Sequence, residues 1–209
     1  MPRIPNRLPM PPIHSRWTHA AQQPGLFGVE AARPIHRLFF ALFPDAAASE
    51  RIERVAEELR PTLSSRCQWV RPERRHLTLH FLGEYDPLAA DQVAAASAAA
   101  DSLDPVSFDV RLDALGSFPG RRPPCVLRSL SGDAPLRHLW KELHHALVHA
   151  GFAAQLSAIF EPHVTLCYGD REAVPRAIAP ISWRAHELRL VHSLADEQAY
   201  RELARWPLA

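Results

Sequence analysis

The sequence has few of the features that mark secreted, disulfide-linked or membrane-spanning proteins. It contains three cysteines in 209 residues, and no two of them form a Cys-x-x-Cys pair. An odd number of widely separated cysteines argues against a disulfide framework and against a zinc site. No apolar run approaches the length of a transmembrane helix, and no secretory signal follows the first residues. We therefore expect a cytoplasmic protein with reduced thiols and no association with membranes.

The sequence also lacks an excess of positive charge. Its formal net charge is +1, and Lys141 is the only lysine. A protein that holds nucleic acid mainly through phosphates has a strongly basic surface. Any contact with nucleic acid is therefore expected to be local, at an end or a short segment.

Residues 1–35 differ from the rest of the chain. Proline recurs through them, and no helical or strand period persists. This composition predicts an extended or disordered tail, followed by one folded domain over 36–209. Within the tail, Gln23-Pro-Gly-Leu-Phe27 resembles the short peptides by which bacterial proteins dock on the DNA sliding clamp; the alternative is a tail sequence with no such role.

Strands and helices are mixed along the folded part. The apolar run 38–43 predicts a buried strand, and amphipathic patterns predict helices from Asp45 to about Pro61, over 87–102 and over 133–150. Further strands are expected at 68–70, 76–82, 106–112, 124–130, 161–168, 185–193 and 198–204. Because this order lacks the strict alternation of a parallel α/β sheet, we expect an α+β fold.

Two of the expected strands carry the same motif, in which a histidine and a threonine alternate with apolar residues. The copies are His76-Leu-Thr-Leu79 and His163-Val-Thr-Leu166. Since side chains alternate between the faces of a strand, His76 and Thr78 share one face, as do His163 and Thr165. The apolar residues, including Phe81 and Tyr168, are expected on the other face. If both strands border one cleft, two imidazoles and two hydroxyls surround a small volume.

These side chains suit acid–base chemistry on a phosphate. Histidine has an ordinary pKa near 6.5, so a neutral and a protonated imidazole can act as base and acid in the same step. A threonine beside each histidine supplies a hydroxyl that can donate to a phosphate oxygen. The alternative is that both motifs serve only the structure.

Further residues near the motifs are candidates for the cleft. His80 shares the face of His76 by alternation; it either lines the cleft or is buried with its hydrogen bonds satisfied. Tyr168 and Arg71 are also possible cleft residues. Arg71, Arg74 and Arg75 precede the first motif and could reach a phosphate, or form a solvated loop.

A second group of histidines lies in the helix expected over 133–150. His145 and His149 have a spacing that can bind a metal ion. They fall, however, with His138 and Lys141 on the face opposite the leucines, which predicts a solvated face. We therefore expect no metal site.

The two motifs closely resemble the paired His-x-Thr-x motifs of the 2H phosphoesterase superfamily. Within it, the likeness is to the bacterial RNA 2′,3′-cyclic phosphodiesterases, also called 2′-5′ RNA ligases or LigT-like proteins. The resemblance extends from Arg37 to the end of the chain. It rests on the segments 37–44, 69–84, 115–119, 124–127, 160–166 and 206–208.

The resemblance implies a bilobal fold, in which two antiparallel sheets with pseudo-twofold symmetry meet at a central groove and the helices lie outside. It also implies a hydrolase that needs neither metal nor cofactor and acts on RNA ends or cyclic nucleotides. We further expect a monomer. His76 would be the proton donor and His163 the proton acceptor, while Thr78 and Thr165 hold the phosphate. The product would be a 2′-phosphomonoester.

Other functions stay open at this point. The same site could ligate or cleave 2′-5′ RNA linkages, or hydrolyse a small cyclic phosphate that is not RNA. The chain could also bind RNA ends without catalysis, although two titrating imidazoles are of little use to such a protein. Finally, it could be an adaptor on the sliding clamp, through Gln23–Phe27.

Overall fold

The computed structural model describes residues 34–130, 133–194 and 197–209. The segment Gln23–Phe27, expected to dock on the clamp, lies outside the described residues. Within these ranges no helix has both the length and the apolar character needed to cross a membrane.

The described chain combines three α-helices with nine strands, which confirms the predicted α+β class. The helices are α1 (Ala46–Leu59), α2 (Ala90–Asp101) and α3 (Ala134–Leu147), with a 3-10 turn η1 (Pro72–Arg74) and a π-helical turn η2 (Val148–Phe152). The strands are β1 (His36–Leu42), β2 (Gln68–Trp69), β3 (Leu77–Tyr85), β4 (Phe108–Ser117), β5 (Pro124–Arg128), β6 (His163–Tyr168), β7 (Arg176–Ala185), β8 (Glu187–Leu194) and β9 (Arg201–Pro207).

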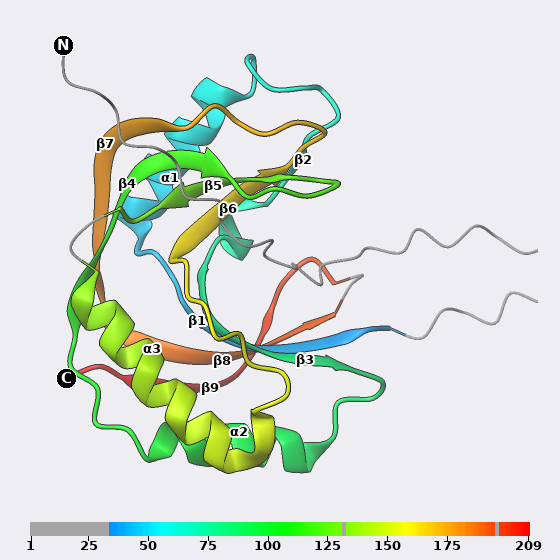
Figure 1. Ribbon diagram of the computed structural model, residues 1–209, viewed down its shortest axis with the longest axis vertical. Helices are drawn as coiled ribbons and strands as arrows, with labels where there is room; N and C mark the ends of the chain where they lie inside the picture. The colour runs from blue at the N-terminus through cyan, green and yellow to red at the C-terminus, as the bar shows by residue number, and fades with distance from the viewer. Residues whose placement is uncertain (1–33, 131–132, 195–196) are drawn as a thin grey trace, which may run out of the picture. The chain divides into compact units, whose positions relative to one another are not determined.

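The strands form one continuous antiparallel sheet, in the order β7-β4-β5-β6-β3-β1-β8-β9, with β2 paired to β6 (Figure 1). The two expected sheets are therefore two halves of a single hydrogen-bonded sheet. The halves meet where β3 pairs with β6, through the single pair Leu77–Val164. The pseudo-twofold relation between the halves stays a prediction.

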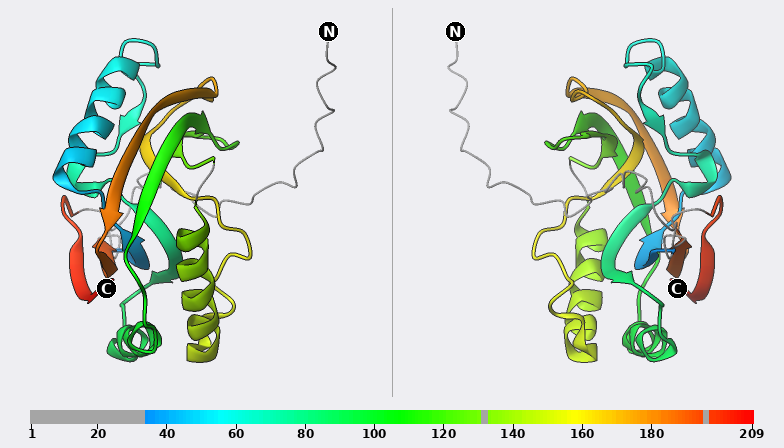
Figure 2. Two further views of the ribbon diagram at one scale, coloured as in Figure 1. Left: turned by 90° about the vertical axis from the view of Figure 1, so that its left-hand side faces the viewer. Right: turned by 90° about the vertical axis from the view of Figure 1, so that its right-hand side faces the viewer.

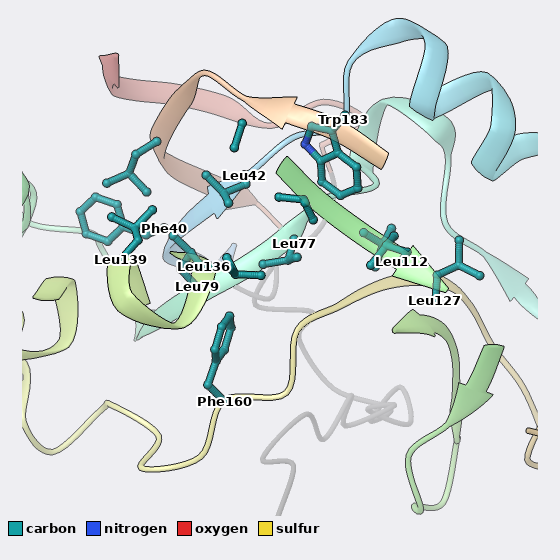
Figure 3. Close-up of a cluster of buried hydrophobic side chains, with 14 of the residues drawn as sticks. Phe40, Leu42, Leu77, Leu79, Leu112, Leu127, Leu136, Leu139, Phe160 and Trp183 are labelled. Carbon is teal, nitrogen blue, oxygen red and sulfur yellow. The ribbon is translucent and has the colours of Figure 1, made fainter. Parts of the chain in front are cut away.

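All three helices pack on one face of this sheet. In α1, the Asp45 carboxylate accepts a hydrogen bond of 2.7 Å from the backbone N–H of Ala48, which caps the helix as predicted. The helices α2 and α3 contact each other, whereas α1 lies away from them and packs against β7 (Figure 2). Their leucines and alanines meet the inner residues of the strands in one core, which includes Leu77, Leu79 and Phe160 (Figure 3). Burial of this apolar surface is the main source of the fold's stability.

The opposite face of the sheet carries a second, smaller apolar cluster. It consists of Phe39, Ala41 and Val191, with Phe43, Phe81 and Tyr200 packed against it. Residues of β1 therefore alternate between the two clusters, as strand geometry requires. Since no helix of the described ranges contributes to this cluster, we call its side of the sheet the helix-free face.

Both motif strands contain a bulge directly after the threonine. The pairing of β1 with β3 skips Leu79, and the pairing of β5 with β6 skips Leu166. An extra residue in one strand shifts the alternation of every side chain that follows. Phe81 therefore lies in the cluster with Phe39, and His80 turns into the helix-covered core. Strict alternation was wrong for both residues.

One strand, β7, was not predicted from the sequence. The segment Arg176–Ala185 forms β7, although Pro175 precedes it and Pro180 lies within it. β7 lies at the end of the sheet and pairs only with β4. An edge strand tolerates proline because one of its sides needs no N–H donors.

Candidate active site

The junction of β3 and β6 brings the two motifs together. Leu77 and Val164 pair across the junction, and both are fully buried in the core. Their neighbours in sequence therefore point to the helix-free face. Extending the antiparallel register by one residue sets His76 opposite Thr165, and Thr78 opposite His163. Side chains directly opposite each other have Cβ atoms about 5 Å apart, so all four share one small area.

Both imidazoles are oriented in the same way. The Nδ1 atom of His76 lies 2.8 Å from the carbonyl oxygen of Arg74, and Nδ1 of His163 lies 2.7 Å from that of Glu161. A carbonyl oxygen only accepts hydrogen bonds, so each Nδ1 carries the proton and donates. The Nε2 atom of each ring is left with its lone pair, ready to accept a proton or, once protonated, to donate one.

Both rings are half-buried, and burial favours the neutral form of each. It lowers the pKa of His76 to about 4, against the opposing effect of the hydrogen bond to Arg74; the charges of His163 and Arg74 lower it further. The pKa of His163 is also lowered by burial, opposed by the hydrogen bond to Glu161. Arg128 lowers it further, while the Glu161 carboxylate raises it. The two imidazoles are thus close enough for one to disfavour a charge on the other.

Aromatic side chains hold the rings from both sides of the junction. Phe39 stacks on His76 with ring centroids 4.9 Å apart, and Tyr200 meets the same ring edge-on at 5.3 Å. Phe118 meets His163 edge-on at 4.8 Å. These contacts remove water from the rings and restrict their rotation, which explains the lowered pKa values.

One arginine stands beside each histidine. The Arg74 guanidinium donates to Ser193 Oγ and to the Glu197 carbonyl oxygen, both at 3.0 Å, and lies 4.4 Å from the centroid of the Tyr200 ring. The Arg128 guanidinium pairs with the Glu161 carboxylate at 3.2 Å. Guanidinium groups suit phosphate recognition, so the site has cations on both flanks.

The sequence did not predict three of these residues as members of the site. They are Arg128, Phe118 and Tyr200, and none of them belongs to a recognisable motif. Arg128 reaches the site because it pairs with His163 across β5 and β6. That neighbour relation exists only once the order of the strands is known.

Tyr168 joins the site because of the bulge in β6. Its hydroxyl lies close enough to Thr165, Arg37 and Arg74 for each of them to lower the pKa of the phenol. Burial raises the pKa of Tyr168, so the phenol stays protonated and can donate. The position of Tyr168 therefore agrees with its prediction as a possible cleft residue. Strict alternation along β6 predicted the opposite face of the sheet.

The remaining candidates before the first motif have separate positions. Arg71 is exposed at the start of η1. Arg75 is buried and pairs with the Glu53 carboxylate of α1, which gives it a structural role. Of the three arginines in this segment, Arg74 is the one that contacts groups around His76.

His80 lies in the core and links β3 to α3. Its Nε2–H donates to the Trp140 carbonyl oxygen at 2.9 Å, and the indole Nε1–H of Trp140 donates to the Leu79 carbonyl oxygen at 3.1 Å. The two rings stack with centroids 5.1 Å apart. His80 is only 2% exposed. Of the two alternatives for His80, the structure therefore supports the buried histidine with satisfied hydrogen bonds.

In the described part of the chain, no three His, Cys, Asp or Glu side chains are grouped so that they could hold a metal ion. His145 on α3 and His149 on η2 are both exposed and lie outside the site, which agrees with the solvated face predicted for them.

Comparison with known proteins finds relatives over most of the chain. A family model described as the 2′-5′ RNA ligase superfamily matches residues 43–197, which include both motifs. A protein of Aquifex aeolicus named RNA 2′,3′-cyclic phosphodiesterase is 31% identical over 133 residues, or 63% of this chain and 69% of that protein. A Thermotoga maritima protein of the same name is 30% identical over 122 residues, or 56% of this chain and 64% of that protein.

Solved structures of LigT from E. coli have a similar fold. The apo form matches with a TM-score of 0.69 and 29% identity, covering 85% of this chain and 99% of that one. The complex with 3′-AMP matches with a TM-score of 0.68 and the same identity and coverage.

The structural role of His80 can be tested by the substitution His80→Phe. Phenylalanine keeps the stacking on Trp140 but removes the donor, which costs about 1–3 kcal/mol of unfolding free energy at pH 7. Burial lowers the pKa of His80 to about 4, below the ordinary 6.5, so the unfolded wild type binds more protons between these values. The wild type therefore loses stability as the pH falls from 6.5 towards 4, and the variant lacks this contribution.

The measurement is urea unfolding of both proteins at pH 7 and pH 5. We expect the stability gap between wild type and variant to narrow at pH 5. A gap that stays constant or widens would show that His80 is not held neutral in the core.

Proposed function

The chain belongs to the 2′-5′ RNA ligase superfamily, and we propose that it hydrolyses the 2′,3′-cyclic phosphate ends of RNA to 2′-phosphomonoesters. The proposal rests on one observation: two imidazoles, each held by a hydrogen bond from Nδ1 to a backbone carbonyl oxygen, share one face with two threonine hydroxyls. Relatives named RNA 2′,3′-cyclic phosphodiesterase support the choice of substrate.

In the proposed reaction, water attacks the phosphorus and the bond to the 3′ oxygen breaks. Nε2 of His163 takes a proton from the water, and the Glu161 carboxylate, which raises the pKa of His163, stabilises the imidazolium that forms. Nε2 of His76 donates a proton to the departing 3′ oxygen. A low pKa makes protonated His76 a strong acid, and the anionic phosphate favours its protonation when substrate is bound.

The hydroxyls and arginines would hold the phosphate in place. Thr78 and Thr165 donate to its non-bridging oxygens, with the Tyr168 hydroxyl behind Thr165. The guanidinium of Arg74 has only neutral hydrogen-bond acceptors, a hydroxyl and a carbonyl, in its contacts with Ser193 and Glu197. It therefore keeps its charge for an anion on the His76 side. In this proposal the chain acts as a monomer and needs no metal or cofactor.

A second candidate activity uses the same residues. Cleavage or formation of a 2′-5′ RNA linkage also breaks or makes a phosphodiester bond, and the description of the family names this reaction. Comparing an RNA with a 2′,3′-cyclic end, a cyclic mononucleotide and a 2′-5′-linked dinucleotide as substrates distinguishes the two.

Substitution of either histidine tests the mechanism. We expect His76→Ala and His163→Ala each to lower kcat on 2′,3′-cyclic CMP about 10²–10⁴-fold, because each removes a general acid or base. His149→Ala, at an exposed position, is the matched control and should leave the rate unchanged. All assays contain EDTA, so a wild type that is inactive under these conditions would contradict the metal-free mechanism.

A substrate with a better leaving group separates the two roles. Replacing the 3′ oxygen by sulfur removes the need for an acid, so this substrate should restore the rate of His76→Ala and not that of His163→Ala. Rescue of His163→Ala instead would exchange the two roles, and near-wild-type activity of either variant on the oxygen substrate would refute the mechanism.

The pH dependence of kcat/KM gives an independent test. This parameter reports the ionisation of the free enzyme, and the reaction needs one neutral and one protonated imidazole. Because burial lowers the pKa of both histidines, both limbs of the bell shift towards acid. We expect the optimum below pH 6.5 on a cyclic mononucleotide. An optimum at or above pH 7 would contradict the burial of the two rings.

A further inference from the structure

The three cysteines, far apart in the sequence, come together on the core side of β6. Cys167 is fully buried in β6, Cys125 is 3% exposed in β5, and Cys67, just before β2, is half-buried. The thiol of Cys167 lies close enough to both of the others to influence their pKa values. Cys167 is thus the central member of a three-thiol cluster, which the spacing of the cysteines does not reveal.

The backbone places Cys125 and Cys167 within reach of a disulfide. They are direct partners in the antiparallel pairing of β5 and β6. Partners in such a ladder have Cα atoms about 4.5–5.5 Å apart, inside the range that a disulfide spans. Each thiol also influences the pKa of the other, as expected for neighbours on one face of the sheet.

Cys67 is the member of the cluster that solvent can reach. Its sulfur lies over Gly169, where a Cβ atom would be only 3.3 Å from it. The glycine thus makes room for the thiol at the end of β6. The charges of Asp170 and Arg171 act on Cys67 from the chain beyond this glycine. An oxidant from solvent therefore meets Cys67 first, and Cys67 contacts Cys167.

We propose that Cys67, Cys125 and Cys167 form a redox-active thiol site, in which a hydroperoxide oxidises Cys67 and Cys167 closes the first disulfide. The site lies on the same strand as Thr165, but its sulfurs face the core rather than the helix-free face.

The oxidation has two steps. The Cys67 thiolate attacks a peroxide oxygen; an S–O bond forms, the O–O bond breaks, and the departing hydroxide takes up a proton from solvent to give one water and a sulfenic acid at Cys67. The Cys167 sulfur then attacks the Cys67 sulfur and gives up its proton; the S–S bond forms, the S–O bond breaks, and the departing hydroxide takes up that proton to leave as a second water. Cys125 can next attack Cys167 and release Cys67 as a thiol, which moves the disulfide inward without further oxidation.

Thiol mapping of the full chain tests the proposal. The reduced protein is treated with stoichiometric hydrogen peroxide at pH 8.5, because burial raises the pKa of Cys67 and the thiolate is the reactive form. The protein is then denatured, so that N-ethylmaleimide reaches the buried thiols as well and blocks every free thiol before peptide mapping. We expect the number of blocked thiols to fall from three to one, with Cys167 in a disulfide within one chain. A protein that keeps three thiols, forms a disulfide without Cys167 or links two chains would overturn the proposal.

Two variants separate the roles of the thiols. In Cys167→Ser we expect no disulfide within the chain, and a sulfenic acid at Cys67 that dimedone traps. In Cys67→Ser only buried thiols remain, so oxidation should slow by about tenfold or more. Oxidation of Cys67→Ser at the wild-type rate would show that Cys67 is not the first thiol to react. Mapping the wild type needs no variant, so the main result does not depend on how either variant folds.

Discussion

The pairing of Leu77 with Val164 is the constraint on which the candidate site depends, because in the described part of the chain it joins the two halves of the sheet. Both side chains are buried in the core that the helices cover. Their burial turns the flanking histidines and threonines to the other face and sets each histidine opposite the threonine of the other motif. A displacement of this pairing by one residue would send the functional side chains into the core. The stability of the core and the geometry of the site therefore depend on the same two residues.

The two imidazoles have similar environments. A backbone carbonyl two residues earlier fixes the tautomer of each ring, an aromatic ring packs against it, and a guanidinium stands nearby. Burial favours the neutral form of both rings. The Glu161 carboxylate opposes this effect at His163, and in the proposed reaction this difference makes His163 the imidazole that takes up a proton and His76 the one that donates it. Acid–base chemistry with two identical side chains requires such a difference.

The sequence predicted the parts of the fold that depend on the periodicity of neighbouring residues. The amphipathic helices α1 and α3, the two motif strands and the α+β class follow from periodicity and capping residues. The bulges at Leu79 and Leu166 depend on which strands pair, so the sequence could not predict the alternation of side chains beyond them. The faces predicted for His80 and Phe81 were therefore wrong. The strand β7 was not predicted, because its prolines are tolerated only at the edge of a sheet. Arg128, Tyr200 and the three-thiol cluster reach their places through long-range pairing, which leaves no trace in spacing.

The most direct test of the account is a crystal structure of the protein with uridine vanadate, which mimics a five-coordinate phosphorus. The account predicts that the vanadium lies between the two motifs, with Nε2 of His76 and Nε2 of His163 each within about 3 Å of a different vanadate oxygen. A vanadate bound to one imidazole only, or bound away from the helix-free face, would contradict it.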